Sequence, residues 1–248
     1  MRSKAPFRLC ASAVMLASAL AVTSLAQPPG AQMYRVTMTH VKPDMLSEWI
    51  DLQKNEVIPA LKKGGVKSRN VFVSGLFGNS FEYTTLEQFD SFAQFDGPGP
   101  LVKALDQPAA FRLNEKLRKC IISSNSYVGN RLLEISNVPE ENPTFIVSTR
   151  YRIAPGKMAD FQALVKSDLL PVYKKNKIGF IVTRRTLGAN TNDVTLSVYY
   201  KKYAELDGGP MLTKLLGQEA ANKINAKFNG IRTSVETIVR SRVADLSF

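Results

Sequence analysis

His40 is the side chain whose type and position best suit acid–base or ligand chemistry, and it is the only histidine in the chain. It closes an expected strand over residues 34–41, where a side chain can point into the space between packed sheets. A neutral imidazole there could act as a general base near neutral pH, or as an axial ligand of haem. A lone histidine at a strand end is more often a packed or hydrogen-bonded structural residue, so both interpretations stay open.

Arginines gather on one face of an expected strand over residues 145–153. Arg150 and Arg152 share that face with Ser148, and in the last expected strand Arg232, Ser234, Glu236 and Arg240 alternate with apolar residues. Polar faces that look inward would line a cavity for a polar or anionic small molecule, whereas outward faces would simply be solvated. An error of one residue in the strand register exchanges the two faces. The candidate ligand-binding residues, with two tyrosines that could also reach the cavity, are Arg150, Arg152, Tyr127, Tyr199, Arg232 and Glu236.

Other mechanisms lack the residues that they require. A single histidine excludes the two-histidine zinc helix, and the sequence contains neither a phosphate-binding loop ending in Gly-Lys-Ser/Thr nor a Gly-x-Ser-x-Gly elbow. Cys10 falls in an expected export signal, which leaves Cys120 as a small buried hydrophobic residue that has no partner for a disulfide. The sequence therefore predicts no metal site and no cofactor, with haem at His40 left as an alternative.

An internal repeat organises the chain. Pro43 and Pro155 are 112 positions apart, and the same offset pairs Pro59 with Pro171 and Trp49 with Phe161. A second match joins the Gly/Pro-rich segments at residues 96–101 and 207–212. A register kept over such distances indicates two copies of one structural unit.

Each copy has the pattern strand, helix, strand, strand, helix, strand, which is the ferredoxin-like α+β arrangement. In that arrangement both helices cover one face of an antiparallel sheet, so the other face needs a partner. We expect the two sheets to face each other as an α/β barrel within one chain, with the helices outside, which makes the protein a pseudo-dimeric monomer. The expected segments are an export signal at 1–26, a first repeat at 33–130, a linker at 137–143 and a second repeat at 144–242.

The expected elements can be given by residue range. Pro59 and Pro171 should bend or shorten the first helix of each copy, because proline supplies no backbone N–H. The first copy is expected to place its strands at 34–41, 69–74, 81–85 and 121–128 and its helices at 44–63 and 101–119. The second copy is expected to place its strands at 145–153, 180–187, 194–200 and 231–240 and its helices at 157–175 and 211–229.

In this order of elements, the paired prolines and the duplicated Gly/Pro loop, the chain resembles the dimeric α/β-barrel superfamily, which includes the antibiotic-biosynthesis monooxygenases and the NIPSNAP-like proteins. The resemblance covers nearly all of the chain after residue 26. It implies the barrel architecture. Because the superfamily includes oxygenases, isomerases, haem enzymes and proteins without known activity, the resemblance implies no particular reaction.

The start of the chain and its charge limit where the protein acts. Basic residues, an apolar stretch at 11–21 and small residues before Gln27 predict a cleaved signal, hence a periplasmic or secreted protein with no later membrane span. The net charge of +12 is spread along the chain without a Lys/Arg block, which argues against a nucleic-acid partner.

Three functions remain open from the sequence. The first is binding of a polar or anionic small molecule between the two sheets. The second is a cofactor-free oxygenase or isomerase that uses His40 as base and a nearby arginine to hold an oxyanion. The third is a structural or partner-binding protein, which a long exposed apolar patch would favour.

Overall fold

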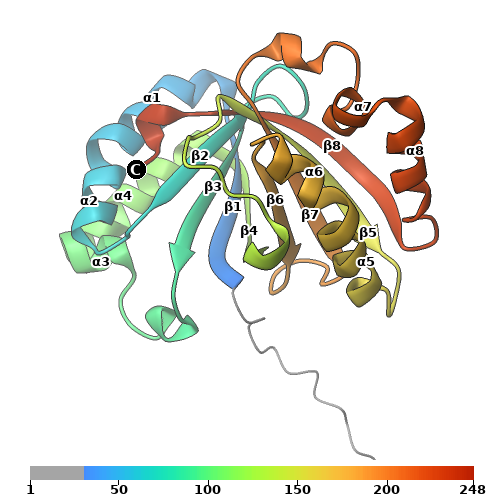
Figure 1. Ribbon diagram of the computed structural model, residues 1–248. Helices are drawn as coiled ribbons and strands as arrows, with labels where there is room; N and C mark the ends of the chain where they lie inside the picture. The colour runs from blue at the N-terminus through green and yellow to red at the C-terminus, as the bar shows by residue number, and fades with distance from the viewer. Residues whose placement is uncertain (1–30) are drawn as a thin grey trace, which may run out of the picture.

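The computed structural model describes residues 31–248, which form two βαββαβ units (Figure 1). The predicted signal at residues 1–26 lies outside the described residues. The strands of the first unit are β1 (Ala31–Val41), β2 (Arg69–Ser74), β3 (Glu82–Phe89) and β4 (Ile121–Leu132), and those of the second are β5 (Phe145–Ile153), β6 (Phe180–Arg185), β7 (Asp193–Tyr200) and β8 (Arg232–Arg242).

The eight strands close into one antiparallel barrel in the order β1-β3-β2-β8-β5-β7-β6-β4. Each unit contributes four neighbouring strands, and short pairings of β2 with β8 and of β4 with β6 join the two sheets. The expected α/β barrel within one chain is therefore confirmed. We call the end of the barrel where β4 finishes and β5 begins the linker end, and the opposite end, where β1 and β5 finish, the far end.

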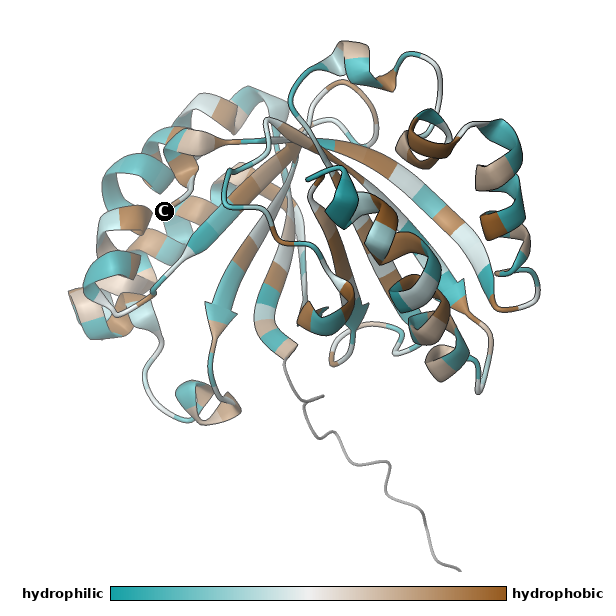
Figure 2. Cartoon of the chain, viewed as in Figure 1, coloured by the Kyte–Doolittle hydropathy of each residue, from teal (hydrophilic) through white to brown (hydrophobic). Residues whose placement is uncertain are grey.

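The helices lie outside the barrel, in one layer on each side (Figure 1). The first layer contains α1 (Leu46–Leu52), α2 (Ile58–Lys63), α3 (Pro100–Leu105) and α4 (Gln107–Cys120), and the second contains α5 (Met158–Leu164), α6 (Leu170–Lys175), α7 (Met211–Leu216) and α8 (Gln218–Ala226). Apolar and polar residues alternate along the strands, so one face of each strand packs on a helix layer and the other looks inward (Figure 2). Two hydrophobic cores result, one beneath each layer. Within residues 31–248, no helix combines the length and the hydrophobicity that crossing a bilayer requires.

Both repeated prolines follow a π-helical segment in their helix. The π segment Gln53–Val57 joins α1 to α2, and Val165–Leu169 joins α5 to α6. Pro59 and Pro171 then occupy the first turn of the next α-helical segment. The wider π turn accommodates the missing N–H, so the helix continues where the sequence predicted a bend or an end.

The end of each unit is buried in the other unit. Ile135, in a 3-10 turn after β4, belongs to the core of the second half, while Leu246, in the matching turn after β8, belongs to the core of the first half. Backbone hydrogen bonds fix both segments, joining Asn137 to Phe180 in one case and Phe248 to Arg69 in the other. Figure 1 shows the C-terminus against the first helix layer. The halves therefore exchange core residues as well as sharing the barrel.

The first half on its own should associate. Residues 31–136, expressed without the remainder, would expose the inward face of their sheet and the open edges of β2 and β4. We expect light scattering after gel filtration to give the mass of a dimer or larger species. A stable monomer with native-like circular dichroism would contradict the dependence of one half on the other.

Candidate functional site

The inward faces of the strands are set by cross-strand register and by a bulge in β8. Arg150 pairs with Glu236, but the next residue, Tyr151, pairs with Ser234, so Val235 has no partner. An extra residue in one strand exchanges the faces beyond it. As a result Glu236 looks into the barrel with Arg150, whereas Arg232 lies on the helix-facing side with Tyr151.

Arg232 is thus separated from the other candidate ligand-binding residues. Its guanidinium stacks on the rings of Phe228 and Tyr151, 3.9 and 4.3 Å from their centroids, and donates to Asn225 Oδ1 at 3.0 Å. It lines a cavity of about 410 Å³ between the second sheet and its helix layer. The interpretation that the polar residues of the last strand share one inward face is wrong at this position, because the bulge divides them.

Three of the predicted residues, Arg150, Arg152 and Glu236, do lie at the far end of the barrel, where they form one charged network with Asp193. Arg150 donates to Glu236 at 2.8 Å and to Asp193 at 2.9 Å, and Arg152 also pairs with Asp193. Asp193 is almost fully buried, with 3% of its side chain exposed. Burial raises the pKa of Asp193, but the hydrogen bonds and charges of Arg152 and Arg150 outweigh it and hold that pKa below its usual value. The expected strand at 194–200 begins one residue after Asp193, where β7 starts, and the sequence did not single this carboxylate out.

A small cavity of about 170 Å³ lies inside the barrel toward the linker end. Apolar side chains from several strands line this cavity, and residues of the linker between β4 and β5 cover it from one side. Asn137 fixes the start of this linker by a β-bridge to Phe180, and Glu141 pairs with Lys201 on its outer side. The apolar lining comes from Val36, Met38, Phe72, Leu86, Ile146 and Ile181.

Two arginines on neighbouring strands line this cavity. Arg131 of β4 faces Thr183 of β6, and Arg185 of β6 faces Gly129 of β4, so the arginines are diagonal neighbours on the inward face. Diagonal positions are roughly 7–8 Å apart at Cα, which is within reach of a shared ligand. We call Arg131 and Arg185 the arginine pair.

An aromatic ring supports each member of the arginine pair. The guanidinium of Arg131 lies 4.6 Å from the ring centroid of Tyr34, and that of Arg185 lies 4.5 Å from the ring centroid of Tyr127. Stacking holds the plane of a guanidinium and leaves its edge free to donate hydrogen bonds. Glycine at position 129 allows Thr183 and Val36 to pack closely against the backbone beside the arginine pair, because a Cβ there would come within 3.0 Å of Thr183 and 3.1 Å of Val36.

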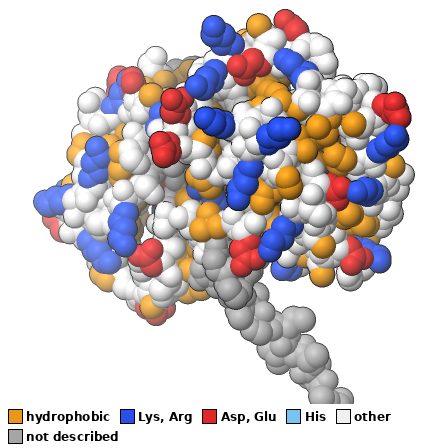
Figure 3. Space-filling model, viewed as in Figure 1, with side chains coloured by type: hydrophobic (Ala, Val, Ile, Leu, Met, Phe, Trp, Pro, Cys, Tyr) orange, Lys and Arg blue, Asp and Glu red, His pale blue; other side chains and the backbone are white. Residues whose placement is uncertain are grey.

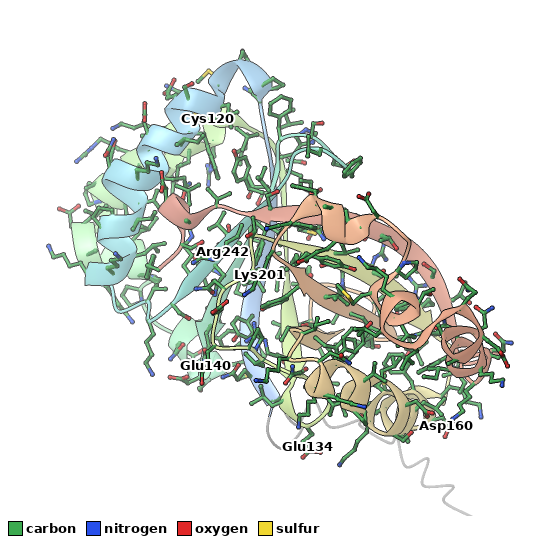
Figure 4. The ribbon with its side chains drawn as sticks, turned by 45° about the horizontal axis from the view of Figure 1, so that its top comes forward. Cys120, Glu134, Glu140, Asp160, Lys201 and Arg242 are labelled. Atoms are coloured by element: carbon green, nitrogen blue, oxygen red, sulfur yellow. The ribbon has the colours of Figure 1, made fainter. Side chains whose placement is uncertain are left out.

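Positive charge exceeds negative charge on the inward faces. Within residues 31–248, the Nε atoms of Arg131, Arg185, Arg240 and Arg242 are buried and have no hydrogen-bond partner. Arg240 lies 3.6 Å from Glu82, and no carboxylate of the described chain forms an ion pair with the other three. Among the described residues, the Arg131 guanidinium donates a hydrogen bond only to the neutral Oε1 of Gln32, at 3.4 Å. In Figure 4 Arg242 lies between the two helix layers, near the centre of the molecule. Outer basic side chains, by contrast, are scattered among acidic ones over the displayed face (Figure 3).

The two predicted tyrosines both line the cavity. Burial raises the pKa of Tyr127 against the opposing effect of Arg185 and Arg240, and burial likewise raises the pKa of Tyr199. Both hydroxyls are therefore protonated at neutral pH and can donate to an anion. A Cβ at Gly179 would come within 2.5 Å of the Tyr199 ring, so glycine there allows this ring to approach the backbone.

His40 lies at the far end, outside the cavity lining. It is directly opposite Glu82 in the β1–β3 pairing, so both side chains take the inward face. Within the described residues the imidazole forms no hydrogen bond or ion pair. The structure pairs His40 with Glu82, whose carboxylate lies 3.6 Å from Arg240, but His40 does not line the cavity of the arginine pair.

The interior cavity does not fit a haem held by His40. Residues 31–248 contain no group of three or more His, Cys, Asp or Glu side chains that could hold a metal ion. A haem held by His40 would have to lie beside the imidazole, whereas the interior cavity of about 170 Å³ is not lined by His40 and is lined in part by charged arginines.

No protein-family model and no curated protein matches the sequence. Solved structures do match it. A protein of Fusobacterium nucleatum subsp. nucleatum named "putative monooxygenase" is 12% identical with a TM-score of 0.60, and the match covers 87% of this chain and 94% of that one. A protein of Lactobacillus acidophilus NCFM with the same name is 13% identical with a TM-score of 0.56, over 88% of this chain and 95% of that one.

A chlorite dismutase mutant of Candidatus Nitrospira defluvii, in complex with cyanide, is also similar. It is 10% identical with a TM-score of 0.53, and the match covers 86% of this chain and 92% of that one. At these identities the likeness establishes the fold alone. The protein has the fold of monooxygenase-like and chlorite dismutase-like dimeric α/β-barrel proteins, which confirms the resemblance seen in the sequence.

Proposed function

We propose that the protein binds a small organic anion inside its barrel. The observation that carries this proposal is a set of three half-buried interior arginines, Arg131, Arg185 and Arg242, whose buried Nε atoms have no hydrogen-bond partner and which form no ion pair within residues 31–248. Removing a charge from water without pairing it is costly, so such a cluster is stabilised when an anion enters. The positive interior also draws an anion toward the cavity.

The lining suits an organic anion better than an inorganic one. The arginine pair can donate parallel hydrogen bonds to a carboxylate, which is the geometry in which arginine binds most strongly. Met38, Phe72 and Ile146 offer an apolar wall for a short carbon chain. The volume of about 170 Å³ is below the usual range for drug-sized ligands, which favours a small molecule.

We also propose that the protein is exported, because its first 26 residues have the pattern of a cleaved signal. The anion would then be met in the periplasm or outside the cell. Mass spectrometry of the protein secreted or released from the periplasm would test this, with Gln27 as the expected first residue.

A thermal-shift screen tests the proposed binding. Short carboxylic acids should raise the melting temperature, because a ligand that binds the folded state alone stabilises it by about 2.7 kcal/mol at 100 times its dissociation constant. The neutral amides of the same acids should have no effect. Matched sodium chloride additions control for ionic strength, and an equal rise with salt, or no rise with any acid, would contradict the proposal.

A catalytic role for His40 stays a prediction and defines the second candidate function. His40 and Glu82 face each other on the inward side, which is an arrangement that could hold an imidazole for proton transfer. His40→Ala should abolish turnover of any substrate found, while it should leave anion affinity within about twofold because the residue is outside the cavity lining. Full turnover in that variant would remove His40 from catalysis.

A further inference from the structure

Arg240 provides a second cationic group across the barrel from the arginine pair. It belongs to β8, and β8 and β4 are four places apart in either direction around the eight-stranded closed barrel, so they lie on opposite walls. Arg240 lines the same cavity as Arg131 and Arg185. Its Nη2 lies 3.6 Å from Glu82 Oε1, beyond hydrogen-bond distance, and its buried Nε has no partner among the described residues.

The repeat shows that the two halves differ at the position of this arginine. Arg240 pairs with Ile146 of β5, and in the first half Gly129 pairs with Tyr34 at the corresponding place of β1. One half therefore has an arginine where the other has a glycine. Arg240 lines the cavity, whereas the matched residue on the opposite wall, Gly129, carries no side chain.

Two threonines on the remaining walls also lack partners. Thr84 of β3 and Thr195 of β7 line the cavity, and their buried hydroxyls form no hydrogen bond with residues 31–248. β3 and β7 are again four places apart in the barrel. Unpartnered polar atoms thus surround the cavity on four sides, and each of them is costly unless a ligand or water satisfies it.

The balance of charge points the same way. Six arginines look inward, on β4, β5, β6 and β8, against three carboxylates, Glu82, Asp193 and Glu236. If the ligand carried a single negative charge at the arginine pair, the two positive charges of Arg240 and Arg242 would still be opposed by only one inward carboxylate, that of Glu82. A ligand with a second negative charge compensates this excess more fully.

We propose that the ligand carries two anionic groups separated by a short carbon chain, as in a small dicarboxylic acid. One carboxylate binds the arginine pair and the other binds Arg240, with Thr84 and Thr195 donating from the sides. The chain between them contacts Met38, Phe72 and Ile146. This inference rests on the proposed function and specifies its ligand class.

Calorimetry with matched acids tests the ligand class on the full mature chain. Succinate and butanoate have the same number of carbons and differ in the second carboxylate. Succinate should bind at least about tenfold more tightly than butanoate, a difference of about 1.4 kcal/mol. Equal affinities for succinate and butanoate would overturn the proposal of a dianionic ligand and leave the proposed anion binding intact. If neither acid binds, and glutarate and malonate do not bind either, both proposals would be contradicted.

A variant that removes one positive and one negative charge tests whether Arg240 binds the second carboxylate of the ligand. Arg240→Met alone leaves Glu82 buried without its neighbour and could fail to fold, so the Arg240→Met/Glu82→Gln double variant is the better test. It should bind succinate no more tightly than the native protein binds butanoate, and its butanoate affinity should stay within about twofold. A retained preference for succinate in the folded double variant would show that Arg240 does not bind the second group.

Discussion

Replacing Asp193 by asparagine should lower the free energy of unfolding by about 3 kcal/mol, the lower part of the range for breaking a buried ion pair. Asp193 is the shared partner of Arg150 and Arg152, and only 3% of its side chain is exposed. The amide has nearly the same shape but no charge. Glu236 is then the one carboxylate of this network that compensates the charges of Arg150 and Arg152. Denaturant unfolding followed by circular dichroism measures the change.

The same variant has a signature in its pH dependence. The pKa of Asp193 in the folded protein lies below its usual value, so its contribution to stability is present above about pH 4 and is lost as the pH falls through the lowered folded pKa. The difference in stability between the native protein and Asp193→Asn should therefore shrink on acidification. Glu219→Gln, which breaks an exposed pair with Lys223, is the control and should change little at any pH. A constant difference down to strongly acidic pH would contradict this account of Asp193.

The Arg131→Met/Arg185→Met variant should lose anion binding by at least about 100-fold. Hydrogen bonds to charged groups contribute about 1.5–3 kcal/mol each, and the variant removes those of both arginines. Methionine keeps an unbranched apolar chain against Tyr34 and Tyr127. The free protein should be as stable as the native one or more so, because replacing buried charges by apolar side chains is often neutral or stabilising. Calorimetry with succinate and denaturant unfolding without it measure the two effects.

Arg232→Met is the matched control for this loss. Arg232 is also a partly buried arginine stacked on aromatic rings, but it lies on the helix-facing side of the second sheet. Its replacement should leave succinate affinity within about twofold. An equal loss of affinity in both variants would mean that the anion responds to overall charge and not to the arginine pair.

The architecture could be predicted from the sequence because the internal repeat presents the same pattern of elements twice. The two copies confirm each other at Pro43 and Pro155 and at Pro59 and Pro171, so each element had two independent patterns in its support. The sequence showed that Arg150 and Arg152 share one face of β5 but left open whether that face looks inward, which the structure shows that it does. Alternation decides a face reliably when a strand has no bulge.

The site was harder to predict for two physical reasons. Val235 of β8 has no partner in β5, and this bulge puts Arg232 on the opposite face from Glu236. Polar and apolar residues nevertheless alternate through this segment of the sequence without a visible break. The expected strand at residues 121–128 ends too early, whereas β4 continues to Leu132 and so brings Arg131 into the barrel. Extending the alternation of Tyr127 and Gly129 by two residues would have found Arg131. The pairing of β4 with β6 that joins it to Arg185 depends on closure of the barrel and has no local signal.

Nuclear magnetic resonance of methionine methyl groups tests the central claim, anion binding inside the barrel, most directly. The chain labelled with ¹³C at its methionine methyls would be mixed with succinate, and Met38→Leu would assign the Met38 signal, since Met38 lines the cavity. An anion site inside the barrel predicts an intermolecular nuclear Overhauser effect from the succinate methylene protons to Met38 and none to Met158, which begins helix α5 in the outer layer and packs against the second hydrophobic core. Binding that perturbs Met158 or no methionine, with no effect at Met38, would contradict an anion site within the barrel.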